Sequence, residues 1–139
     1  MKAILIDPQK KSISEIESDF SLTELKKIIE AKDISEISDL SAQNIIYITG
    51  ESDKIPMAKY AFKFPPTIIF GKAVIGGISE KGERRDYSIS IDEIKNTIAF
   101  LSLKESEFYR KIFNPTNVAD SIKLPKSLDL IKFTPKHKR

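Results

Sequence analysis

Short apolar runs that end at turn residues constrain the fold of this chain most. Lys2–Asp7 is almost wholly apolar and is followed by Pro8. Asp followed by Pro suits a type I turn, so this run predicts a buried strand that ends in a turn. Residues 11–17 predict the hairpin partner of that strand. Because Ile13 and Ile16 are three residues apart and break strict alternation, we expect a bulge or an edge position there.

Four later segments also have the character of strands: 44–49, 58–64, 67–75 and 84–89. The segment 58–64 alternates apolar and polar residues with a period of two, which is typical of a half-buried strand. In 67–75, Gly71 marks a bulge or a close backbone approach, and Gly76-Gly77 should end the strand. Residues 33–43 predict a polar loop with one short strand.

Two helices begin with a Ser-x-x-Glu capping box, in which each side chain satisfies the backbone N–H of the other residue. Ser21 and Glu24 predict a helix over 22–32, and Ser90 and Glu93 predict a second helix from 91 to 101. The same signal recurs from Ser102 to Glu105. The second helix therefore either breaks at Ser102 or continues to 113, where Asn114-Pro115 ends it.

This order of elements lacks regular strand–helix–strand alternation, so it favours an α+β fold. We expect a mostly antiparallel sheet of four to six strands, with two or three helices packed on one face. Residues 1–113 would form a single domain, and 114–139 would form an extended basic tail punctuated by three prolines.

Positive charge is concentrated in that tail. Residues 123–139 contain six basic residues and one acid, which gives a net charge of +5, whereas the whole chain carries +3. A basic arm on a slightly acidic body predicts contact with nucleic acid or with an acidic protein surface. The alternative is a terminus whose lysines only keep it soluble. The candidate contact residues are Lys123, Lys126, Lys132, Lys136, Lys138, Arg139, Arg84 and Arg85.

A second basic surface is possible on the sheet, where Lys59, Lys63 and Lys72 would join Arg84 and Arg85. The favoured interpretation is that these residues simply face solvent and discourage aggregation of strand edges. The aromatic residues Tyr60, Phe62 and Phe64 present a similar choice. A platform for stacking bases would need them exposed, but core packing is the favoured interpretation because no recognition-sheet signature accompanies them.

The composition excludes several kinds of chemistry. The chain has no cysteine and a single histidine, His137, which rules out thiolate chemistry and a multi-histidine metal site within one chain. The glycine-containing segment from Gly71 to Gly77 lacks the order of a phosphate-binding loop. Acids at 33, 36 and 39 lack the spacing of a calcium loop. We therefore predict no catalytic residue, no metal site and no cofactor.

The opening MKAILIDP and the segment FGKAVIGG from Phe70 to Gly77 resemble those of a family of short, uncharacterised proteins encoded by phages and plasmids. The resemblance covers roughly residues 1–101 and depends mainly on hydrophobic spacing. It implies an accessory protein of a mobile element and supplies no site residue. The extension after Phe113 departs from the family pattern.

Two hypotheses of function are favoured over a third, an enzyme with acid-only or substrate-assisted chemistry, which would need a deep pocket lined by converging carboxylates. The first is a non-enzymatic accessory protein whose tail contacts nucleic acid or an acidic partner within a larger assembly. The second is a protein–protein inhibitor or adaptor that acts on a host enzyme through a sheet edge or an apolar patch, and a homo-oligomer is also possible. Without a signal sequence or a membrane span, we expect a cytoplasmic protein, in a host cell or inside a virion, that is neither secreted nor bound to a membrane.

Overall fold

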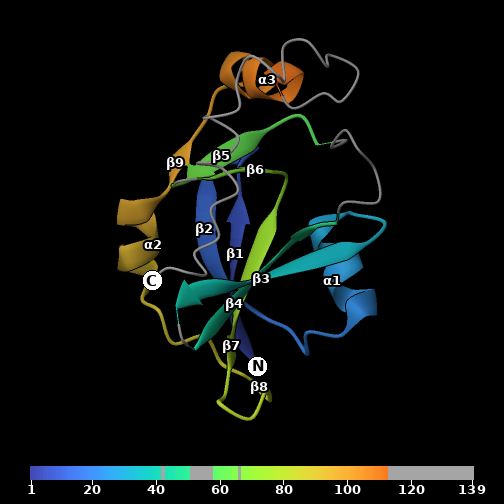
Figure 1. Cartoon of the computed structure of the whole chain (residues 1–139), viewed down its shortest axis with the longest axis vertical. Coiled ribbons are helices and arrows are strands. Elements are labelled where there is room, and N and C mark those ends of the chain that lie inside the picture. The colour runs from blue at the N-terminus through green and yellow to red at the C-terminus, as the bar shows by residue number, and fades with distance from the viewer. Residues whose placement is uncertain (42, 51–57, 66, 113–139) are drawn as a thin grey trace.

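The computed structural model describes residues 1–41, 43–50, 58–65 and 67–112. The basic tail, including Lys123, Lys126, Lys132, Lys136, Lys138 and Arg139, lies outside the described residues. Within the described part, two antiparallel sheets and three helices form an α+β fold (Figure 1). The predicted fold class is thereby confirmed.

The larger sheet has the strand order β2-β1-β7-β4-β3, with β8 paired to the end of β7. Every pairing in it is antiparallel. The predicted hairpin pairs Lys2 with Glu17 and Asp7 with Ser12, and its second strand lies at the sheet edge, which was one of the two expected positions. The bounds are β1 Lys2–Asp7, β2 Ser12–Glu17, β3 Ile34–Ser41, β4 Asn44–Thr49, β7 Ala73–Ile78 and β8 Arg84–Arg85.

Strict alternation along the central strands separates two apolar layers. In β1, Ala3 belongs to one cluster, whereas Ile4 and Ile6 belong to the other. In β7, Val74 faces the first cluster and Ile75 faces the second. Because neighbouring side chains of a strand point to opposite faces, both faces of the large sheet need a covering layer.

Helix α1 (Leu22–Ile29) covers one face through its buried residues Leu25 and Ile29. The helix begins where Ser21 accepts a hydrogen bond from the Glu24 N–H at 3.2 Å. The reciprocal half of the predicted capping box is displaced, because the Glu24 carboxylate accepts from the Asp19 N–H instead. The helix ends at Ile29, three residues earlier than predicted, because its C-cap Glu30 adopts a φ of 64°.

The other face is covered by the small sheet and by α2 (Ile91–Thr97), so the helices lie on both sides of the large sheet and not on one face as expected (Figure 1). Phe62 and Ile94 are fully buried in this layer. The large sheet needs a covering layer on each face because its central strands have apolar side chains on both faces. The small sheet has the order β6-β5-β9, with β5 at Ala61–Phe64, β6 at Thr67–Phe70 and β9 at Ala99–Phe100.

The predicted strand over 67–75 is divided at Gly71, which links β6 of the small sheet to β7 of the large sheet. Gly71 adopts a φ of 88°, a conformation that residues with a Cβ rarely tolerate. A Cβ at this position would lie 3.1 Å from the Cβ of Ala58. Gly71 is therefore a crossing point with a close backbone approach rather than a bulge.

Gly76 and Gly77 do not end the strand as predicted but lie inside β7. A Cβ on Gly76 would meet the Phe20 ring at 2.6 Å, and one on Gly77 would lie 2.0 Å from the Asp86 carbonyl oxygen. These two glycines let an aromatic ring and another backbone segment pack directly against the sheet.

The predicted second helix breaks, as one of the two alternatives anticipated. Helix α2 ends at Thr97, β9 follows, and α3 (Leu103–Ile112) begins after Ser102. Ser102 and Glu105 form a complete capping box, with hydrogen bonds of 2.8 Å and 3.0 Å in the two directions. β9 was not predicted, because two residues are too few for a periodic pattern.

Candidate functional site

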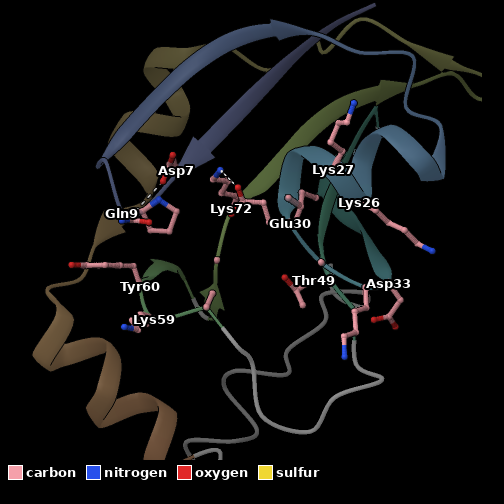
Figure 2. A pocket seen from close by; sticks show the side chains of 16 residues that line it. Asp7, Gln9, Lys26, Lys27, Glu30, Asp33, Thr49, Lys59, Tyr60 and Lys72 are labelled. Carbon is pink, nitrogen blue, oxygen red and sulfur yellow. Dashed lines mark hydrogen bonds and ion pairs between the residues drawn. The ribbon is translucent and has the colours of Figure 1, made fainter.

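A cleft opens where several turns converge at one end of the large sheet. It has a volume of about 640 Å³, within the range of about 300–1,000 Å³ that is usual for ligand sites. Its walls come from the turn after β1, the C-terminal end of α1, the end of β4, the residues before β5 and the link between β6 and β7 (Figure 2).

Five lysines from three separate segments line this cleft: Lys26, Lys27, Lys32, Lys59 and Lys72. Lys26 and Lys27 belong to the last turn of α1, where a positive charge interacts favourably with the helix dipole. That effect gives two of the lysines a structural role. It does not account for Lys59, which precedes β5, or for Lys72, which follows β6 and lies beside Glu30 (Figure 2).

Three carboxylates, Asp7, Glu30 and Asp33, are among the described residues that line the cleft. Asp7 is buried and accepts hydrogen bonds from the N–H groups of Gln9 and Lys10 in the turn after β1. Glu30 forms an ion pair of 3.4 Å with Lys72 (Figure 2).

The third carboxylate, Asp33, lies against Gly50, where a Cβ would come within 2.3 Å of Oδ2. Among the residues that the structure describes, Lys26, Lys27, Lys32 and Lys59 form no ion pair with a carboxylate. The described residues that line the cleft have a net charge of +2, from five lysines and three acids.

The wall that carries Lys59 is held in place by α3. Arg110 donates a hydrogen bond to the carbonyl oxygen of Ala58. The buried Ser106 hydroxyl accepts from the Ala61 N–H at 3.0 Å. The N–H of Gly71 donates to the Tyr60 carbonyl at 2.8 Å. These contacts fix residues 58–61 on both sides, so Lys59 and Tyr60 extend from a supported backbone.

Two carboxyl groups with lowered pKa values lie outside the cleft. The N–H and hydroxyl groups of Ser21 lower the pKa of Asp19. The N–H and hydroxyl groups of Ser102 do the same for Glu105. Both shifts result from hydrogen bonding at a helix start, so each has a structural cause.

Two tyrosines have raised pKa values, and these also lie outside the cleft. Burial raises the pKa of Tyr47, against the opposing effect of the nearby Arg84 guanidinium. The hydrogen bond that Tyr87 donates to the Glu15 carboxylate raises the pKa of Tyr87. Both phenols belong to the framework around β8.

The predicted basic surface is divided by the structure. Lys59 and Lys72 meet in the cleft, whereas Lys63 is exposed on β5. Arg84 and Arg85 lie on β8, beyond the other end of β7.

Arg84 is engaged at that end. Its Nε donates to the Tyr47 hydroxyl at 2.6 Å, and its Nη2 lies 3.2 Å from Glu36 Oε2. Arg85 is exposed and pairs with Gly77. The two arginines therefore do not join the lysines of the cleft.

Sequence reasoning missed Lys26, Lys27 and Lys32. Their positions near the predicted helix end were visible, but nothing in the sequence placed that helix end opposite Lys59 and Lys72. Phe62 is fully buried as expected, whereas Tyr60 is partly exposed and lines the cleft.

No family model, curated protein or solved structure matches this chain. Within the described residues, no helix has the length and apolar character to cross a membrane. The same part of the chain holds no group of three or more Asp, Glu, His or Cys side chains arranged to bind a metal ion.

Proposed function

We propose that this protein is a non-enzymatic accessory protein that binds a polyanion, with the cleft as its folded binding surface and the basic tail as a second contact. The gathering of five lysines from separate segments around one cleft carries the proposal. Lysine ammonium groups bind phosphates and release the counterions condensed on a nucleic acid.

The charge balance of the cleft supports this function. Among the described lining residues, five lysines exceed three carboxylates, and four of those lysines form no ion pair with a described carboxylate. A concave surface with an excess of one sign of charge concentrates ligands of the opposite sign. The resemblance to phage and plasmid proteins adds the expectation of an accessory role in a mobile element, within a cell or an assembled particle.

Equilibrium binding of labelled DNA across a salt series tests this proposal. The double variant Lys32→Glu/Lys59→Glu should weaken binding by about tenfold at low salt and reduce the slope of log affinity against log salt by about 2. The matched control Lys81→Glu/Lys104→Glu makes the same change in net charge at exposed positions outside the cleft, and it should have a much smaller effect.

Removal of residues 123–139 measures the contribution of the tail. We expect weaker binding that keeps its dependence on Lys32 and Lys59. If the full chain binds no DNA at low salt, or if both double variants weaken binding equally, the cleft is not the binding surface.

A second candidate function is that of a protein adaptor or inhibitor. The observation that favours it is the exposure of Phe108 and Leu103 on α3, at 60% and 41%. An adaptor would retain a stoichiometric protein partner in the Lys32→Glu/Lys59→Glu variant and lose it in Leu103→Ser/Phe108→Ser. Light scattering of both variants would show whether the partner is a second copy of the chain.

A further inference from the structure

A second groove lies beside the cleft, and one aromatic residue connects the two. The second groove is lined by Lys11, Ile13, Lys95, Ile98 and Phe100 and has a volume of about 240 Å³. The Lys11 ammonium lies 5.8 Å from the centre of the Tyr60 ring, and Tyr60 itself lines the cleft. Tyr60 therefore lies where the cleft and the second groove meet.

Two lysines line the second groove, Lys11 and Lys95. Lys63 is not part of this lining: it pairs with Ala99 on the small sheet, so its side chain lies on the opposite face from Phe62 and Phe100. Lys11 comes from the turn before β2, and Lys95 comes from α2. Like the lysines of the cleft, they converge from separate elements.

We propose that the cleft and the second groove form one path for single-stranded nucleic acid, with Tyr60 stacking on a base where the two grooves meet. This inference rests on the proposed function and specifies its ligand. Surfaces that bind single strands combine a basic groove with aromatic rings on which bases stack. The bases of a duplex are paired and stacked on each other, so they offer no free face to a ring at the junction.

The contact between Lys11 and Tyr60 fits this role. At 5.8 Å it is near the outer limit of about 6 Å for a cation–π interaction, so it is a weak contact that a base can replace. Lys11 then becomes available for a neighbouring phosphate. A phosphate chain without bases would use the lysines but would gain nothing from Tyr60.

Fluorescence anisotropy of the full chain with three labelled probes tests this inference. The probes are an oligothymidylate of about 12 nucleotides, within the usual site sizes of about 4–16, the same strand in a duplex, and an abasic strand of equal length. We expect the oligothymidylate to bind about tenfold more tightly than the abasic strand, and more tightly than the duplex, at the same salt concentration.

Variants of Tyr60 test whether its ring causes the difference in affinity between the oligothymidylate and the abasic strand. Tyr60→Ala should weaken binding of the oligothymidylate by about tenfold and leave the abasic strand unchanged, whereas Tyr60→Phe should change either affinity by less than about twofold. The control Phe108→Ala removes an exposed ring from α3, outside both grooves, and should have no effect.

The outcomes separate the two proposals. Equal binding of all three probes with dependence on Lys32 and Lys59 would overturn the stacking role and leave polyanion binding intact. Preference for the duplex would overturn the single-strand assignment. Because the probe comparison uses the unaltered protein, it gives an answer even if Tyr60→Ala fails to fold.

Discussion

The two ends of strand β7 lie in contrasting surroundings. Where β7 ends, at Ile78, the charged residue Arg84 bonds to Tyr47 and Glu36. Where β7 begins, directly after Lys72, lysines from several elements converge around a cleft. We call the first region the β8 network, meaning residues 84–88 and the side chains that they contact.

In the β8 network, polar groups fix the path of the chain. Asn44 exchanges two hydrogen bonds with Ser88, and the Asp86 carboxylate accepts from the Lys2 N–H at 2.8 Å. In the cleft, most of the lysines lack such partners among the described carboxylates. The contrast teaches that Arg84 and Asp86 in the β8 network help to maintain the fold, whereas most of the described lysines in the cleft have no such role, and we propose that they serve a ligand.

The largest effect on stability should come from Gly77→Ala. The new methyl group would lie 2.0 Å from the Asp86 carbonyl oxygen, so the backbone of the β8 network must move. We expect the free energy of unfolding to fall by about 3 kcal/mol, measured by denaturation in urea. Gly82→Ala is the matched control, because Gly82 has a φ of 87° and nothing near its Cβ position. It should cost about 1 kcal/mol, and an equal cost for both variants would contradict the close packing at Gly77.

Removing one ion pair at each end of β7 should change the free energy of unfolding by different but smaller amounts. Arg84→Ala removes a partly exposed ion pair and also the hydrogen bond to the buried Tyr47. We expect the free energy of unfolding to fall by about 1–2 kcal/mol. Lys72→Ala removes an ion pair with a largely exposed partner and should cost less than about 0.5 kcal/mol.

The Arg84→Ala variant should also change the pKa of the Tyr47 phenol, which can be measured by spectroscopy. Burial raises the pKa of Tyr47 above its ordinary 10.0, and the Arg84 charge opposes that rise. Arg84→Ala should therefore raise the pKa of the Tyr47 phenol further in an ultraviolet titration. Since the folded state favours the neutral phenol, its contribution to stability is present below pH 10.0 and is lost as pH rises through the folded pKa. Tyr47→Phe should reduce that alkaline loss.

Neutral substitutions in the cleft should hardly change stability. Lys27→Gln and Lys32→Gln alter exposed side chains that form no ion pair with a described carboxylate. We expect changes within about 0.5 kcal/mol in the free energy of unfolding, together with weaker DNA binding. A loss of stability as large as that of Arg84→Ala would mean that these lysines hold the fold together.

The smallest effect should be the acid response of the capping box of α3. Hydrogen bonds from Ser102 lower the pKa of Glu105 below 4.5, so its contribution to stability is present above that value. The contribution is lost as pH falls through the folded pKa. Glu105→Gln should therefore flatten the decline of the melting temperature in acid. Glu107→Gln, on the same helix but outside the capping box, should leave the decline unchanged.

Local chemistry made much of the fold predictable from the sequence. The turn at Asp7-Pro8 predicted the first hairpin, the lack of regular strand–helix–strand alternation predicted the α+β class, and the serines at 21, 90 and 102 marked helix starts. The structure of residues 67–78 was not predicted correctly. A continuous apolar run does not reveal that the chain leaves one sheet and enters the other at Gly71. The roles of Gly76 and Gly77 depend on Phe20 and Asp86, which are distant in sequence.

The cleft was harder to predict than the fold. Lys59 and Lys72 were considered together, but they were grouped with Arg84 and Arg85, which lie at the other end of β7. The lysines in and after the last turn of α1 were missed because a helix C-terminus is already a favourable place for lysine. Only the three-dimensional fold places that helix end opposite residues 58–60.

Nuclear magnetic resonance of the full chain during titration with the oligothymidylate tests the central claim most directly. We predict that the backbone amide signals of residues 26–32, 59–60 and 71–72 shift with the strand concentration, while those of residues 84–88 stay in place. Shifts confined to residues 84–88, or to the tail at 123–139, would contradict the assignment of the cleft as the binding surface.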